Sequence, residues 1–258
     1  MIDTKQLNWF HEKGYLLLES YLPNDVTEQL VSDLPILLSQ DSEAVYRQDG
    51  SDAIRTVFSP EQFSPIYDRV SKLHLIVEPI RQMLEDEVYL FQSKFNTKVS
   101  LARGCWDWHQ DFTFWKDDGM PAPKAITVAI YLQDVTQFSG PMVIIPGSHK
   151  LGTVYTTMEN PDGVHSENLK YVISRETIQE AVEQCGDMVS TAGPKGSVLF
   201  FHSNVLHAST QNLYFKNRDL LMLTYNAVSN ASMPVSNPRP EYMVKRNFNA
   251  VKVVNSLV

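Results

Sequence analysis

The spacing of hydrophobic positions along the chain changes near residue 88. Before it, apolar residues recur at helical spacing, as Val26 and Leu30 do after a helix-start signal at residues 24–25. A second helical pattern covers residues 60–84, and a short extended piece covers residues 14–19. Beyond it, short runs rich in β-branched and aromatic residues alternate with turn clusters. These runs predict strands over residues 88–96, 125–132, 142–145, 197–201 and 220–225.

Helices followed by many short strands favour a mainly β fold with flanking helices. We expect a double-stranded β-helix, the jelly-roll or cupin-like barrel, with a helical layer on its outside. A chain of 258 residues that is 43% hydrophobic can build one sizeable core, and no linker or repeat divides it. We therefore expect a single domain over residues 1–258. Residues 155–190, a polar loop followed by a helix-like stretch, are expected to form an insertion or lid.

Charge and targeting signals narrow the class of partner. A formal net charge of −8 argues against a nucleic-acid surface or an anionic membrane, and mildly against a CoA thioester substrate. No apolar run is long enough to span a bilayer, and the N-terminus lacks a signal-peptide pattern. With only Cys105 and Cys185 in the chain, a reduced, cytoplasmic setting is the simpler expectation.

The segment WDWHQDFTFWKDDGMP, residues 106–121, places His109 and Asp111 two residues apart in an aromatic run. In an extended strand, residues at this spacing point to the same face. An imidazole and a carboxylate that project together need only a distant histidine to form the two-histidine, one-carboxylate triad that holds Fe(II). A second pair of this kind, His165 and Glu167, lies in a polar loop without strand character, and we interpret it as solvent-exposed.

The distant histidine has two candidates, His202 and His207. His202 continues a buried strand and is interpreted as a core histidine. His207 ends that unit, and Arg218 opens the next strand, so adjacent strands joined by a turn could bring the two to one cavity. Arginine offers a planar, two-pronged donor that matches a carboxylate. A metal triad beside such an arginine indicates a dicarboxylic cosubstrate, whereas a surface charge at a strand edge is the alternative for Arg218.

The order of His109, Asp111, His207 and Arg218, with GPMVIIPGSHK at 140–150, resembles the phytanoyl-CoA dioxygenase superfamily of Fe(II)/2-oxoglutarate enzymes. Within it, WHQDFTFWKDDGMPAPKA is similar to ectoine hydroxylase, to a free-proline 4-hydroxylase and most of all to leucine 5-hydroxylase. DVTQFSGP at 134–141 and NPRPEY at 237–242 are shared with the leucine enzyme type.

This resemblance implies roles for nine residues and three small molecules. Fe(II), 2-oxoglutarate and O₂ are the expected cofactor and cosubstrates. The metal and catalytic ligands would be His109, Asp111 and His207; the cosubstrate would be bound by Arg218, Ser209, Gln92 and Asn96; and the substrate would contact Arg239 and Trp115. The carboxylate at position 111 favours hydroxylation over halogenation.

The expected reaction is hydroxylation of an unactivated C–H bond of a free aliphatic L-amino acid. Leucine at C5 is the expected substrate, and proline, ectoine or another small amino acid are alternatives. A rival of another class is a non-catalytic jelly-roll binding protein, in which the histidines would serve the fold alone. The presence of all four expected metal-binding and cosubstrate-binding residues, the triad and Arg218, argues against this rival.

Overall fold

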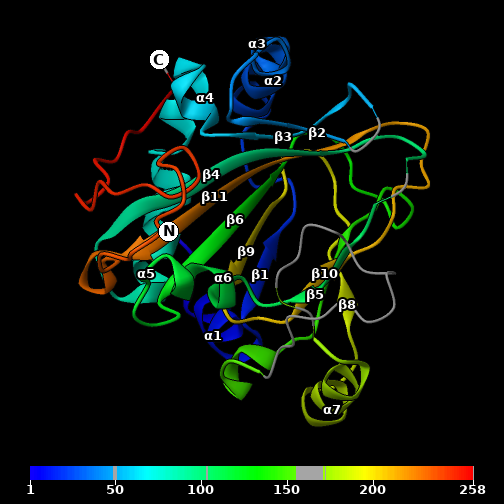
Figure 1. The fold of residues 1–258 in the computed structure, drawn as a ribbon, viewed down its shortest axis with the longest axis vertical. Coiled ribbons are helices and arrows are strands. Elements are labelled where there is room, and N and C mark those ends of the chain that lie inside the picture. The colour runs from blue at the N-terminus through cyan, green and yellow to red at the C-terminus, as the bar shows by residue number, and fades with distance from the viewer. Residues whose placement is uncertain (49–50, 103, 155–170, 172, 258) are drawn as a thin grey trace.

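Two antiparallel sheets face each other in the computed structural model of the protein (Figure 1). The structure describes residues 1–48, 51–102, 104–154, 171 and 173–257. In spatial order, the seven-stranded sheet contains β1 (Tyr15–Leu18), β9 (Val198–His202), β6 (Ala125–Tyr131), β11 (Arg218–Ala227), β4 (Val88–Lys98), β3 (Ile54–Phe58) and β2 (Val45–Arg47). The four-stranded sheet contains β5 (Trp106–His109), β10 (His207–Ser209), β7 (Met142–Ile144) and β8 (Val189–Ser190). The expected fold class is confirmed.

The helices of the first third of the chain cover the outer face of the large sheet. The α-helices are α1 (Thr4–Lys13), α2 (Asn24–Ser32), α3 (Leu34–Leu38), α4 (Pro65–Val70), α5 (His74–Leu84), α6 (Asp111–Asp117) and α7 (Arg175–Cys185). Short 3-10 helices are η1 (Pro60–Gln62), η2 (Ser148–Leu151) and η3 (Val228–Asn230). None of the helices in the described ranges is long and apolar enough to cross a membrane.

Alternate residues of the large-sheet strands face two different cores, as the period of two in a strand requires. In β11, Leu221 and Leu223 lie in the core shared with buried residues of α1, α2, α4 and α5. Leu220 and Met222 point the other way, into a core that includes residues of both sheets. The inward-facing set of each strand is therefore the set available to line an interior site.

Residues 60–84 form three short helices rather than one continuous helix. Ser64 is extended, its hydroxyl accepts hydrogen bonds from the backbone of Ile66 and Tyr67, and Pro65 follows it. A residue before proline avoids the helical region, and serine followed by proline is a strong helix start. Leu73 is again extended and precedes α5. The apolar spacing survives these breaks because all three pieces pack on the same sheet.

The C-terminal arm, residues 231–257, runs along the end of the large sheet without forming a helix or a strand of its own (Figure 1). Backbone hydrogen bonds from Lys245 to Phe91 (2.9 Å) and from Val251 to Val88 (2.8 Å) fix it to β4. The expected insertion or lid falls partly on residues 155–170 and 172, which lie outside the described residues. Its second half contains α7, as the helix-like stretch predicted.

Candidate active site

Three possible metal ligands, two from residues 109–111 and one from a distant strand, come together in the structure. His109 is the last residue of β5, Asp111 the first of α6, and His207 the first of β10. The nearest Asp111 carboxylate oxygen lies 3.7 Å from Nε2 of His109 and 4.0 Å from Nε2 of His207. All ligand atoms lie within 4.8 Å of one another, and no other group of three His, Cys, Asp or Glu side chains in the described ranges does so. The predicted triad is therefore assembled.

The local backbone at the triad differs from the prediction. His109 and Asp111 were expected on one strand, but β5 ends at His109 and Gln110 is the N-cap of α6. The Gln110 side chain is fully buried and donates to the carbonyls of Gly152 (2.8 Å) and Asn204 (2.7 Å). These bonds hold the strand-to-helix junction that turns the carboxylate back toward the imidazole.

Each histidine of the triad is oriented by a carbonyl two residues before it. Nδ1 of His109 lies 2.6 Å from the carbonyl oxygen of Asp107, and Nδ1 of His207 lies 3.0 Å from that of Val205. A carbonyl only accepts, so Nδ1 of each ring must donate, and Nε2 faces Asp111. Burial, with His207 adding to it, lowers the pKa of His109 to about 3. This ligand is thus neutral and ready for a metal at pH 7.

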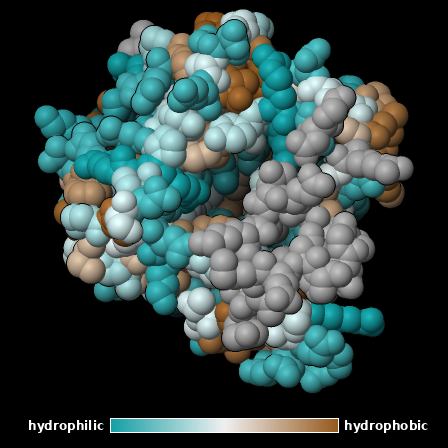
Figure 2. All heavy atoms as spheres, in the orientation of Figure 1, coloured by the Kyte–Doolittle hydropathy of each residue, from teal (hydrophilic) through white to brown (hydrophobic). Residues whose placement is uncertain are grey.

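A cavity of about 340 Å³ opens beside the triad and is lined by residues of both sheets, α6 and the C-terminal arm. The face of the molecule seen in Figure 2 is mostly hydrophilic and is hollowed near its centre. The described lining residues include five cationic side chains, namely Arg47, Arg55, Lys94, Arg218 and Arg239. Asp111 is their one acidic side chain. The walls therefore favour anionic ligands, although the chain as a whole is acidic.

Arg218 and Ser209 form a polar end of the cavity. Arg218 is 4% exposed, and its Nε lacks a hydrogen-bond partner; the hydroxyl of Ser209, which is 5% exposed, lacks one too. Burial lowers the pKa of Arg218 to about 10, so the guanidinium stays charged at pH 7. A buried charge and a buried, unused hydroxyl that line the same cavity are costly unless a ligand completes their hydrogen bonds. A carboxylate would satisfy both groups.

The strands that carry His207 and Arg218 differ from the expectation. They were expected to be adjacent, but β10 belongs to the small sheet and β11 to the large one. The chain crosses between the sheets in the loop that joins these strands, so the two side chains approach one cavity from different walls. Lys98 holds this crossing in place, because its ammonium donates to the carbonyls of Gly104, Ser209 and Thr210.

The four remaining expected residues all line the cavity, but several are already engaged. Gln92 donates its amide to the carbonyl of Met243 (2.9 Å), and Asn96 accepts from Thr56 (2.8 Å). Trp115 is buried and lies edge-on to Phe91, with centroids 5.4 Å apart. It faces the cavity because it stands one helical turn after Asp111.

Arg239 is not a free loop charge. Its Nε lies 2.9 Å from one carboxylate oxygen of Asp118, and Nη2 contacts the other. Asp118 is 7% exposed and directly follows α6. The pair joins the C-terminal arm to α6, the helix that begins with Asp111.

The sequence interpretation missed Lys94 and the β2–β3 hairpin. Lys94 has the same parity on β4 as Gln92 and Asn96, so alternation could have identified it. Burial lowers the pKa of Lys94, and Asp111 partly offsets this effect. The hairpin adds Tyr46, Arg55 and other residues to the cavity wall, and Arg55 lies 4.4 Å above the ring of Trp106.

The two rejected histidine candidates have different outcomes. His202 is mostly buried at the end of β9, away from the triad, and its Nδ1 accepts from the backbone of Asn204 (3.0 Å). The interpretation of His202 as a core histidine therefore agrees with its position. His165 and Glu167 lie outside the described residues.

Comparison with known proteins assigns the chain to a family. The model of the family Phytanoyl-CoA dioxygenase (PhyH) matches residues 10–218. The chain belongs to this family. It is 33% identical over 251 residues to the L-proline trans-4-hydroxylase of Streptomyces griseoviridis, a match that covers 94% of this chain and 92% of the relative.

Solved structures show the same fold with ligands. EctD from S. alaskensis with 2-oxoglutarate and 5-hydroxyectoine has a TM-score of 0.86 and 29% identity to this dioxygenase, over 100% of this chain and 89% of that one. EctD with bound Fe has a TM-score of 0.85 and 28% identity, with the same coverage. The triad of this dioxygenase is the donor set that Fe(II) takes, and its buried guanidinium and hydroxyl fit a carboxylate. The expected class of enzyme and its expected cofactors are confirmed.

Proposed function

We propose that this dioxygenase hydroxylates an unactivated C–H bond of a free aliphatic L-amino acid. The supporting observation is the distribution of groups around one cavity: a metal triad, a buried guanidinium at one end, and a second guanidinium beside an aromatic wall. In this reaction the substrate, 2-oxoglutarate and O₂ give the hydroxylated product, succinate and CO₂. Bound iron supplies the oxidising chemistry, and the protein fixes geometry and excludes wasteful turnover.

Each polar group then has a task. His109, Asp111 and His207 would hold the iron on one side and leave coordination positions open toward the cavity. Arg218 and Ser209 would bind the far carboxylate of 2-oxoglutarate, for which both have unused hydrogen-bonding capacity. Asn96, which lines the same wall through β4, would limit the volume next to the cosubstrate.

The substrate side combines a fixed charge with apolar surface. Arg239 would bind the carboxylate of the amino acid, and it lies between two prolines that restrict its backbone. Trp115 would line the side chain of the substrate, whereas Gln92, like Asn96, would lie next to the cosubstrate. One methylene is worth about 1–3 kcal/mol in such a pocket, so close aliphatic analogues should differ in rate.

Two substrates lead the candidates. Leucine at C5 is favoured by the NPRPEY and DVTQFSGP resemblance, and proline at C4 is favoured by the similarity to L-proline trans-4-hydroxylase. Ectoine is a third candidate, because EctD is similar over 100% of this chain.

The test is succinate release by the iron-loaded enzyme across a panel of free amino acids and ectoine, with mass spectrometry of the products. We expect hydroxylated leucine to form fastest, and leucine amide to be poor because it lacks the carboxylate. A preference for proline or ectoine would show that leucine is not the main substrate, but it would not contradict the proposed iron-dependent hydroxylation. Efficient turnover of leucine amide would contradict the proposed substrate class. Failure to turn over any free amino acid would contradict it as well.

A further inference from the structure

The carboxylate of Asp118 holds Arg239 from one side only. It engages Nε and Nη2 of the guanidinium, and Nη1 makes no hydrogen bond to a described residue. The Asp118 side chain is 5% exposed and that of Arg239 is 37% exposed, so the anion is buried behind the cation and the cation faces the cavity. A side-on pair of this kind fixes the plane of the guanidinium.

The partner of Arg239 stands on the same helix as a metal ligand. Asp111 is the first residue of α6, and Asp118 caps its end. Seven residues at 1.5 Å each separate their backbones by roughly 10 Å. Trp115 lies between them and forms part of the cavity wall. One rigid helix therefore sets the separation between the metal triad and the guanidinium.

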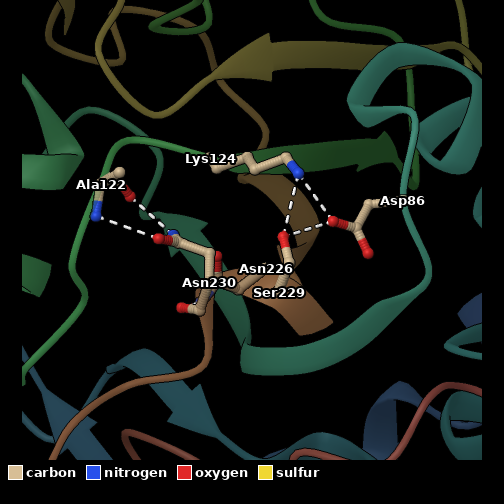
Figure 3. Close-up of polar contacts among 6 residues, drawn as sticks. All are labelled: Asp86, Ala122, Lys124, Asn226, Ser229 and Asn230. Carbon is tan, nitrogen blue, oxygen red and sulfur yellow. Dashed lines mark hydrogen bonds and ion pairs between the residues drawn. The ribbon is translucent and has the colours of Figure 1, made fainter.

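The segment that follows Asp118 makes further bonds to η3 and to the start of the C-terminal arm. The carbonyl of Gly119 accepts a hydrogen bond from the backbone of Met233 (2.9 Å). Position 119 requires glycine because its φ is +87° and because a Cβ there would collide with the carbonyl of Met233. Asn230 bridges both backbone groups of Ala122, and Figure 3 shows this contact beside the neighbouring Lys124–Asp86 ion pair. The segment after α6 is thus fixed to η3 and to the start of the C-terminal arm.

We infer that Asp118 is a positioning residue that sets how far from the metal the substrate carboxylate is held, and that it thereby selects the carbon that is hydroxylated. This inference rests on the proposed function, because it needs Arg239 to bind the substrate carboxylate. Neighbouring carbons of an aliphatic chain differ by about 1.5 Å in position. A displacement of the guanidinium by one bond length is therefore enough to present a different carbon.

Two substitutions separate position from charge. Asp118→Glu keeps the carboxylate and lengthens it by one methylene, so Arg239 must shift. Asp118→Asn keeps the size and removes the charge. Asp117→Asn is the matched control, since Asp117 is the preceding carboxylate and accepts from Tyr171 (2.7 Å) instead of contacting Arg239.

The experiment measures the ratio of hydroxylated regioisomers, the KM of the amino acid, the affinity for 2-oxoglutarate and the retention of iron. In Asp118→Glu we expect an altered regioisomer ratio and a kcat that falls by up to roughly 100-fold, the cost of an ångström-scale misplacement. In Asp118→Asn we expect a higher KM. Binding of 2-oxoglutarate and iron should match the wild type in both, and Asp117→Asn should match it throughout.

A double-mutant cycle tests whether Asp118 acts through Arg239. If it does, Asp118→Asn should no longer raise the KM in an Arg239→Gln background. An equal effect in both backgrounds would overturn the inference, as would a wild-type regioisomer ratio in Asp118→Glu. Loss of iron by either Asp118 variant would overturn it too, because it would show a structural role for the end of α6. Thermal unfolding checks that each variant is folded. If Asp118→Asn does not fold, the result of Asp118→Glu decides the test. A wild type that hydroxylates no free amino acid would refute the proposed function and this inference with it.

Discussion

His109 and His207 are direct partners across the antiparallel strands β5 and β10, with ring centroids 4.1 Å apart. Opposite residues of one ladder are held by the register of the sheet, and a slip by one residue would turn a side chain to the other face. Two of the three proposed metal ligands are thus placed by strand pairing, and the third, Asp111, by the start of a helix.

The first prediction concerns these ligands. His109→Ala and His207→Ala should each lower iron affinity by more than the roughly 10- to 100-fold that loss of an outer hydrogen-bond partner costs, and should abolish turnover. Iron content after desalting and succinate release measure the two effects. His11→Ala, at the exposed end of α1, is the control and should keep both. Iron retained by the His109 variant would contradict the triad.

The second prediction concerns Arg218. Arg218→Lys keeps the charge but loses the two-pronged geometry, so 2-oxoglutarate should bind more weakly by about 1–3 kcal/mol. Titration of 2-oxoglutarate against the iron-loaded protein measures this change. The KM of the amino acid is the internal control and should change much less. Equal loss of affinity for both ligands would point to collapse of the cavity instead of a lost cosubstrate contact.

The third prediction concerns Gln110. Its amide donates to Gly152 and Asn204 and accepts from the backbone of Val154 (2.9 Å). Gln110→Ala would leave the buried carbonyl of Asn204 unpaired, which costs about 1–3 kcal/mol, and would also remove the partner of the part-buried backbone groups of Gly152 and Val154. We expect a lower free energy of unfolding in urea and a reduced iron affinity, because the junction between His109 and Asp111 loses its anchor. Normal iron affinity in a destabilised variant would limit Gln110 to a role in folding.

The fourth prediction concerns stability at acid pH. Burial, with His149 and His11 adding to it, lowers the pKa of His202 to about 3. In the unfolded chain His202 takes up a proton near pH 6.5, but in the folded protein only near pH 3. The free energy of unfolding is therefore unaffected by His202 above pH 6.5 and falls as the pH is lowered from 6.5 toward 3. The slope contributed is at most about 1.4 kcal/mol per pH unit. Urea unfolding from pH 7 to pH 4.5 should show a shallower decline in His202→Gln, and parallel curves would exclude His202 as the source.

The residues of the candidate site could be proposed from the sequence, but the secondary structure that brings them together could not. His109 and Asp111 lie together because of a helix cap, and period alone could not show that a strand stops between them. His207 and Arg218 meet across two sheets, and three-residue β10 is too short to carry a periodic signal.

Contacts between residues far apart in the sequence could not be predicted from it. Asp118 and Arg239 are 121 residues apart, and nothing local in either segment indicates the other. The long buried strands β4, β6, β9 and β11 were predicted closely, because their apolar and β-branched runs reflect burial on both faces. The β2–β3 hairpin was missed because its strands, of three and five residues, are too short to carry a clear periodic signal.

The family match ends at residue 218, whereas the C-terminal arm begins at residue 231. The triad, Ser209 and Arg218 all lie within the matched part, and Arg239 lies beyond it. The EctD structures nevertheless cover 100% of this chain, so the arm belongs to the fold that is shared with them. Under the proposed function, the two guanidiniums that would orient the two ligands lie on separate segments, Arg218 on β11 and Arg239 on the arm. A change in the arm would therefore alter the contacts of the amino acid while the cosubstrate contacts on β11 keep their place.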